Sequence, residues 1–125
     1  MKALFILNDA PYGSERTYNG LRLAGAISKQ EDSEKLLAGH PNEVRVFLIG
    51  DAVAAAHSRQ KVPEGFYNIE VMLGNVTRHG GAVGICGTCL DARGIAESDL
   101  AEGARRSTLA DLAGWTAWAD KVLVF

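Results

Sequence analysis

Nearly continuous apolar runs alternate along this chain with segments in which apolar residues recur at helical spacing. The continuous runs are 2–8, 44–50, 82–85 and 121–125. Helices are expected at 15–29, 52–57, 67–79 and 108–119. A continuous apolar run is typical of a strand that is covered on both faces, as in a parallel sheet. The alternation therefore predicts an α/β fold, a three-layer α/β/α sandwich around a mostly parallel sheet.

Polar residues at the borders of these segments predict where helices begin and where loops lie. Ser14, Asp51 and Ser107 are expected to be N-cap residues, because their side-chain oxygens can accept hydrogen bonds from the first helical N–H groups. The polar stretch over 30–42 is expected to be a surface connection with one helical turn near its middle. For 103–106 the sequence fits both a short edge strand and a loop.

The last predicted helix is apolar almost all round. The stripe expected to face the sheet is Leu109, Leu112, Ala113, Thr116 and Ala117. Trp115 and Trp118 are offset from it by about 120° and 180°, at about 100° per residue. A helix that is apolar on most sides is usually buried on both. Two interpretations stay open: a second subunit covers the tryptophans, which makes the protein a homo-oligomer, or loops of the same chain cover them.

Composition and charge narrow the classes of function. The chain has 125 residues, which fits one domain spanning 1–125. Its 13 basic and 15 acidic side chains form no basic block, which argues against nucleic acid as a partner. No apolar run approaches the roughly 20 residues of a membrane span. No signal-peptide pattern follows Met1, so we expect a cytoplasmic protein without membrane contact.

The two cysteines carry the strongest chemical signal of the chain. Cys86 directly follows the strand predicted over 82–85, where backbone N–H groups and a helix dipole can lower a thiol pKa. Gly87 leaves room for a substrate sulfur, and Arg93 can stabilise a thiolate or a persulfide anion. Cys89 is spaced to form a disulfide with Cys86. Small buried apolar residues are the alternative, but the position between glycines favours reactive thiols.

Loops after other predicted strands contribute candidate residues to the same edge of the sheet. The carboxyl ends of parallel strands meet at one edge, where a cleft forms. The residues expected to line this cleft are Asn8, Tyr12, Gly13, Ser14, Glu15, Asp51 and Gly87. Turn and cap duties are the alternative for the loop residues, and they are the favoured interpretation for Ser14 and Asp51.

No cofactor and no metal are expected. Two cysteines supply half of the four ligands that a structural zinc needs, and His57 and His79 have no ligand spacing to them. The chain contains no Gly-x-Gly-x-x-Gly or phosphate-loop pattern. A thioredoxin-like site is disfavoured as well, because the cysteine pair follows the third predicted strand rather than an early one.

Four segments together resemble the DsrE/DsrF/TusD family, and most closely its small YchN-like branch. They are NDAPYGSE at 8–15, FLIGDAV at 47–53, CGTCLDARGI at 86–95, and WT followed by ADKVL within 115–123. They occur in the family's order along nearly the whole chain. The resemblance implies a five-stranded parallel sheet in the order 4-3-2-1-5 and a homo-oligomer, often a hexamer.

The same resemblance implies sulfur chemistry. In sulfur-relay members one cysteine takes a persulfide sulfur from a donor protein and passes it to an acceptor protein, and Cys86 has that cysteine's spacing to an Arg-Gly pair, Arg93-Gly94. Cys89 departs from the relay members and marks the YchN-like branch. Three hypotheses stay open. They are sulfur transfer through Cys86 by a sulfurtransferase or a carrier, a redox switch or oxidoreductase with a Cys86–Cys89 disulfide, and a non-catalytic oligomeric ligand-binding module.

Overall fold

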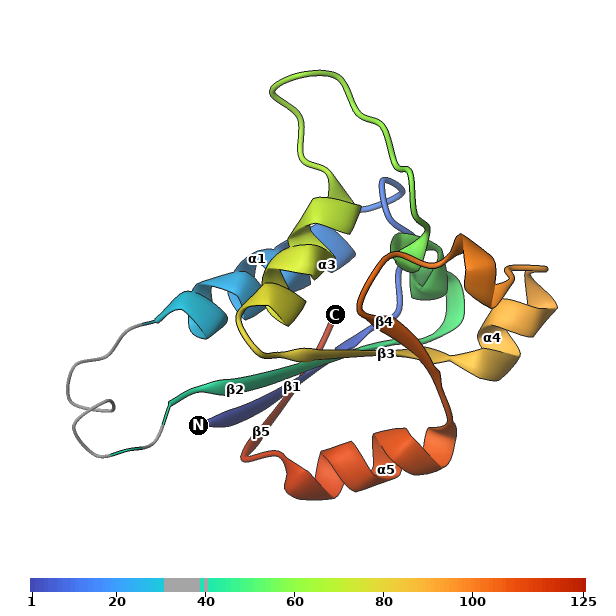
Figure 1. Cartoon of the computed structure of the whole chain (residues 1–125). Helices are drawn as coiled ribbons and strands as arrows, with labels where there is room; N and C mark the ends of the chain where they lie inside the picture. Colours follow the sequence, from blue (N-terminus) through green and yellow to red (C-terminus); the bar gives the residue numbers. More distant parts are fainter. Residues whose placement is uncertain (31–38, 40) are drawn as a thin grey trace.

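A five-stranded parallel sheet forms the centre of the computed structural model, which describes residues 1–30, 39 and 41–125. The strands are β1 (Lys2–Leu7), β2 (Glu43–Leu48), β3 (Ala82–Cys86), β4 (Ala104–Ser107) and β5 (Lys121–Val124). They lie in the order β4-β3-β2-β1-β5, and all neighbouring strands are parallel (Figure 1). The expected α/β fold and strand order are confirmed, and 103–106 contributes to an edge strand. The turn predicted within 30–42 lies outside the described residues.

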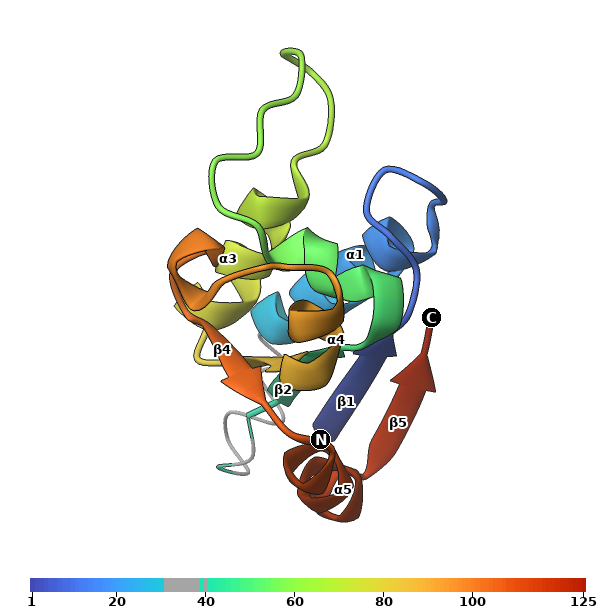
Figure 2. The same ribbon diagram turned by 90° about the vertical axis from the view of Figure 1, so that its right-hand side faces the viewer.

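Helices cover both faces of this sheet, as the sequence predicts. One face carries α1 (Arg16–Lys29) and α3 (Ile69–Arg78), and the other carries α5 (Leu109–Trp118) (Figures 1 and 2). Three short helices complete the described connections: η1 (Gly50–Ala56) lies between β2 and α3, and α4 (Gly87–Ala92) and η2 (Glu97–Asp99) lie between β3 and β4. Among the helices that the structure describes, none is long and apolar enough to span a bilayer.

The centre of the sheet is buried on both faces, which explains the continuous apolar runs of the sequence. Residues 3–5 of β1 and 46–48 of β2 have no solvent-exposed surface. On the face covered by α1 and α3, α1 adds Leu21 and Ala24 to this core, and α3 adds Leu73. Burial of apolar side chains therefore stabilises the packing of helices on both faces of the sheet, and this packing fixes where the strands end.

None of the three predicted residues is the N-cap residue of its helix, although the Ser14 hydroxyl still accepts the first helical N–H. Glu15 is the N-cap of α1, while the Ser14 hydroxyl donates to Asp9 at 2.7 Å and accepts the first helical N–H at 3.3 Å. Ile49 precedes η1, and the Asp51 carboxylate turns to an arginine instead. Ser107 ends β4, and the next residue, Thr108, caps α5 in a reciprocal pair with Asp111.

The face that α5 presents to the sheet also differs from the prediction. Leu112 is buried as expected, but Leu109 is 70% exposed, and Trp115 packs edge-on against Phe47 with ring centroids 6.0 Å apart. The side chain of Arg45 on β2 lies over both tryptophan rings, 3.9 Å from the centroid of Trp118. These tertiary contacts turn the tryptophans toward the chain's own sheet. Within the described chain they pack against the sheet and not under a loop, and a second subunit over the rest of their surface stays a prediction.

Gly84 on β3 makes room for this arrangement. A Cβ atom at this position would lie 3.0 Å from Trp115 and 3.2 Å from Phe47. The orientation of α5 therefore depends on a glycine in the neighbouring strand, which helical periodicity does not register.

The packing of α5 on β2 generates a prediction for stability. Phe47→Ala should lower the free energy of unfolding by about 3–5 kcal/mol, because it opens a cavity beneath Trp115. Phe66→Ala is the matched control, since Phe66 is 69% exposed, and it should change the free energy of unfolding by less than about 0.5 kcal/mol. Urea denaturation followed by circular dichroism measures both variants, and equal losses would contradict the described packing.

Candidate functional site

Cys86 is the last residue of β3, and α4 begins at the next residue. Its Cα pairs with that of Ser107 across the β3–β4 ladder, so the thiol lies at the carboxyl edge of the sheet. Only 8% of the residue is exposed. It opens into a pocket of ≈ 340 Å³ lined by residues of α4, the end of β4 and the first turn of α5. In Figure 2 this edge faces the viewer, with β4 beside α4 and α5 below.

The surroundings of the Cys86 sulfur favour its ionised form. Burial alone would raise the pKa of the thiol, but hydrogen bonds with the Cys89 thiol and the Thr88 hydroxyl outweigh burial and lower it. The Thr88 Oγ1 atom lies 3.3 Å from the sulfur. The backbone N–H groups of Thr88 and Cys89 lower the pKa further, although neither reaches the geometry of a full N-cap hydrogen bond. Cys86 is therefore the more nucleophilic thiol of the pair.

Cys89 has the opposite character. Burial raises the pKa of its thiol, and the hydrogen bond that it shares with Cys86 raises it again. Its sulfur also accepts the backbone N–H of Gly50 at 3.3 Å, which ties α4 to η1. Both cysteines are free thiols. One thiol is thus poised to ionise while its neighbour keeps a proton to donate, which is an arrangement suited to nucleophilic attack.

Arg93 lies near the cysteine pair but outside the pocket of Cys86. Its Nη2 atom pairs with Asp51 Oδ1 at 2.7 Å, and its Nη1 atom donates to the carbonyl of Cys89 at 3.1 Å. Its charge lowers the pKa of Cys89, against the effect of burial. The structure therefore joins two residues that the sequence nominated, Asp51 and Arg93, in a link between η1 and α4. A direct role of Arg93 toward the Cys86 sulfur stays a prediction.

Arg106 on β4 lines the Cys86 pocket, and sequence reasoning missed it. Its Nη1 and Nη2 atoms each donate to Asp91 on α4 at 2.8 Å, in a bidentate pair. The guanidinium crosses directly over Gly87, where a Cβ atom would lie 2.8 Å from Nε. The sequence predicted that Gly87 leaves room for a substrate sulfur, and the structure shows that it also leaves room for the Arg106 side chain. The alternation of side chains along an edge strand was the available signal, but the sequence left that strand undecided.

The loop after β1 takes no part in the pocket around Cys86. Five residues nominated for the cleft lie in this loop: Asn8, Tyr12, Gly13, Ser14 and Glu15. Asn8 donates from its side chain to the carbonyl of Phe125 at 3.1 Å, and Tyr12 donates to Gln60 at 2.5 Å while its ring stacks on Tyr67. The reason is topological: β2 separates β1 from β3, and the loop folds toward α3 instead.

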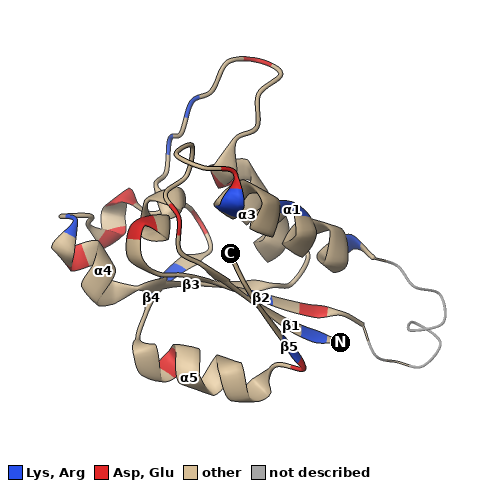
Figure 3. Cartoon of the chain, turned by 180° about the vertical axis from the view of Figure 1, so that it is seen from behind, with Lys and Arg blue, Asp and Glu red and all other residues tan. Residues whose placement is uncertain are grey.

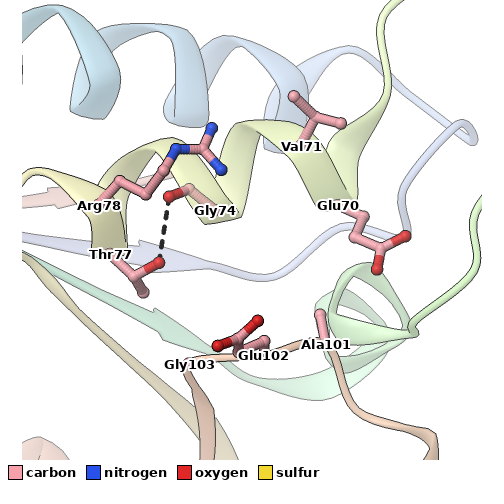
Figure 4. A pocket seen from close by; sticks show the side chains of 8 residues that line it. All are labelled: Glu70, Val71, Gly74, Thr77, Arg78, Ala101, Glu102 and Gly103. Atoms are coloured by element: carbon pink, nitrogen blue, oxygen red, sulfur yellow. Dashed lines mark hydrogen bonds between the residues drawn. The ribbon is translucent and has the colours of Figure 1, made fainter.

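A larger pocket, of ≈ 630 Å³, lies elsewhere, between α3 and the segment that leads into β4 (Figure 4). Its polar lining includes Thr77, whose hydroxyl donates to the carbonyl of Gly74, and Glu70, which accepts the N–H of Gln60. It includes neither cysteine. Within the described part of the chain, no group of three or more His, Cys, Asp or Glu residues is arranged to hold a metal ion. The cysteine pair is therefore the candidate site.

Fold and site together define an α/β protein with a paired thiol at the end of an inner parallel strand. The chain belongs to the DsrE/DsrF-like family, whose model matches residues 1–125. Protein YchN of Escherichia coli (strain K12) is 45% identical over 124 residues, which cover 99% of this chain and 98% of that protein. The uncharacterized protein MJ0989 of Methanocaldococcus jannaschii is 38% identical over the full length of both chains.

Solved structures agree with this assignment. The crystal structure of the ychN protein from E. coli superposes with a TM-score of 0.87 at 44% identity, covering 100% of this chain and 99% of that one. The protein of unknown function MTH1491 from Methanobacterium thermoautotrophicum reaches a TM-score of 0.67 at 15% identity, covering 99% and 98% of the two chains. The second match supports the fold alone.

The contact between Thr88 and Cys86 predicts a pH effect. Alkylation of Cys86 by iodoacetamide should reach half of its maximal rate at a pH below that of an ordinary thiol. Thr88→Val removes the hydroxyl that stabilises the thiolate, so this midpoint should move to higher pH and the rate at neutral pH should fall severalfold. Thr116→Val is the control, because that hydroxyl donates to its own helix. An unchanged midpoint in Thr88→Val would contradict the assigned contact.

Proposed function

We propose that this protein carries sulfane sulfur on Cys86. The thiolate attacks the outer sulfur of a donor persulfide, R–S–SH, so that the S–S bond of the donor breaks and a new S–S bond forms. The products are Cys86–S–SH and the donor thiolate R–S⁻, which takes up a proton from water. An acceptor thiolate then attacks the same outer sulfur and regenerates the Cys86 thiolate. Every step is an exchange, so no metal or organic cofactor is required.

One observation carries this proposal: the thiol with the lowered pKa faces a pocket that admits a second sulfur. Cys86 supplies the nucleophile, and the pocket of ≈ 340 Å³ in front of it has space for a persulfide and the group that bears it. Cys89 donates a hydrogen bond to Cys86 and keeps its own proton, which separates the roles of the two thiols. Membership of the DsrE/DsrF-like family supports the same chemistry.

A second candidate function follows from the closeness of the two thiols. Cys86 and Cys89 share a hydrogen bond, so a mixed disulfide on Cys86 has a resolving thiol beside it. In that reaction a substrate disulfide R–S–S–R is reduced to two thiols, while the cysteines are oxidised to a Cys86–Cys89 disulfide. Persulfide transfer needs one cysteine, whereas this reaction needs both.

Intact-mass spectrometry tests the first function. Incubation with a cysteine desulfurase and cysteine should add one sulfur atom to the wild-type protein, and reductant should remove it. Cys86→Ser should abolish the adduct, while Cys89→Ser should keep it because the nucleophile remains. A wild-type protein that stays unmodified with several persulfide donors would overturn the proposal.

Thiol counting after mild oxidation separates the two functions. The redox function requires that both thiols disappear together and that Cys89→Ser loses the reaction. Persulfide transfer requires that Cys89→Ser still accepts sulfur. If neither sulfur transfer nor disulfide formation is observed, a non-catalytic ligand-binding module is the supported alternative.

We further propose that the protein is a homo-oligomer, a hexamer by its family, and that the outward face of α5 is covered by another copy. Asp111 is the one charged residue of this helix (Figure 3), and Leu109, Ala113 and Ala117 are exposed on it. An exposed face of this composition is typical of subunit contacts.

Light scattering after size-exclusion chromatography tests the assembly. The wild type should elute with a mass of several chains, and Ala113→Glu should reduce it by placing a charge in the contact. Ala26→Glu, an identical change on an exposed position of α1, is the control that should leave the mass unchanged. A monomeric wild type would refute this assignment.

A further inference from the structure

The guanidinium of Arg106 is held in the Cys86 pocket by a bidentate ion pair and by its close fit over a glycine. Asp91 fixes Nη1 and Nη2 with two hydrogen bonds of 2.8 Å, and the missing side chain of Gly87 leaves space for the guanidinium beside the strand end. Pairing with Arg106 lowers the pKa of Asp91, so the carboxylate is ionised and the pair persists at neutral pH. A long, flexible side chain is thereby placed at one location next to the thiol.

The bidentate pair engages two of the five N–H donors of this arginine, and Nε–H is one of the three that it leaves unused. Asp91 engages Nη1 and Nη2, and Nε–H has no hydrogen-bond partner among the residues that the structure describes. Nε is also the Arg106 atom nearest to the Cβ position of Gly87. The other acidic group of the pocket does not compete, because Asp111 accepts the N–H and the hydroxyl of Thr108. A donor with partial positive charge therefore remains available in the pocket that Cys86 shares.

We propose that Arg106 is an anion-recognition residue, held over Gly87 by Asp91, that selects reagents carrying negative charge beside the atom that Cys86 attacks. The substrate class that follows is a protonated persulfide, or another sulfane-sulfur compound, with an anionic group adjacent to the sulfur that is attacked. This naming of the substrate rests on the proposed persulfide function, but the recognition itself does not. Arg106 binds the charge, and Cys86 forms the bond.

Two alkylating reagents of nearly equal size test this recognition. Iodoacetate is anionic and iodoacetamide is neutral, and each reacts with the Cys86 thiolate to form a thioether and release iodide. Because both reagents react with the same thiolate, a change in the pKa of the thiol alters both rates equally. The ratio of the two rates therefore measures only the preference for the charged reagent. Fragment mass spectra locate the product on Cys86 rather than on Cys89.

Arg106→Gln should lower the iodoacetate-to-iodoacetamide ratio about two- to five-fold, the range expected of one partly exposed charge interaction. Gly87→Ala should lower it in the same direction, because its Cβ displaces the guanidinium without removing it. Arg105→Gln, one residue earlier on β4, is the control and should leave the ratio unchanged.

An Arg106→Gln ratio equal to that of the wild type would overturn the inference. If Arg106→Gln does not fold, Gly87→Ala still decides the question, because a ratio equal to that of the wild type in this variant would also overturn the inference. Persulfide formation with an unchanged ratio refutes anion recognition alone. An altered ratio without any persulfide refutes the proposed function and leaves the anion site standing.

Discussion

The pairing of β3 with a strand on each side is the constraint on which the site depends. Ile85 pairs with Leu48 of β2 and with Arg106 of β4, so both neighbouring strands fix the position of the residue that precedes Cys86. Cys86 is the residue at which this ladder ends and α4 begins. The position of the thiol is therefore set by the register of a buried sheet and not by the local loop.

Burial and polar contact act against each other at this thiol, and the balance decides its chemistry. A cysteine with 8% exposure in a purely apolar setting is inert, since burial disfavours the thiolate. Here the turn after the strand brings the Thr88 hydroxyl, the Cys89 thiol and two N–H groups to one sulfur. The same hydrogen bond that lowers the pKa of Cys86 raises the pKa of Cys89. The lowered pKa of one thiol and the raised pKa of the other thus have a common origin.

Sequence reasoning succeeded where the pattern is local and failed where the fold brings distant residues together. The apolar runs of β1 and β2 and the position of Cys86 at a strand end follow from the chain itself. Arg106 does not, because its place beside Gly87 depends on the register of a four-residue edge strand. The face of α5 was mispredicted for a similar reason: Arg45 and Gly84, on other strands, decide where Trp115 packs. Periodicity contains no information about such partners.

The packing of α5 on β2 makes the tryptophan fluorescence of this protein specific to one part of the fold. Both tryptophans of the chain belong to this helix, and a cation lies over each indole ring: Arg45 over both, and Lys2 over Trp118 at 5.9 Å. Indole emission therefore reports on one layer of the sandwich and not on an average over the molecule. Because the first turn of the same helix borders the Cys86 pocket, a change in that pocket that shifts α5 also changes the surroundings of both indole rings.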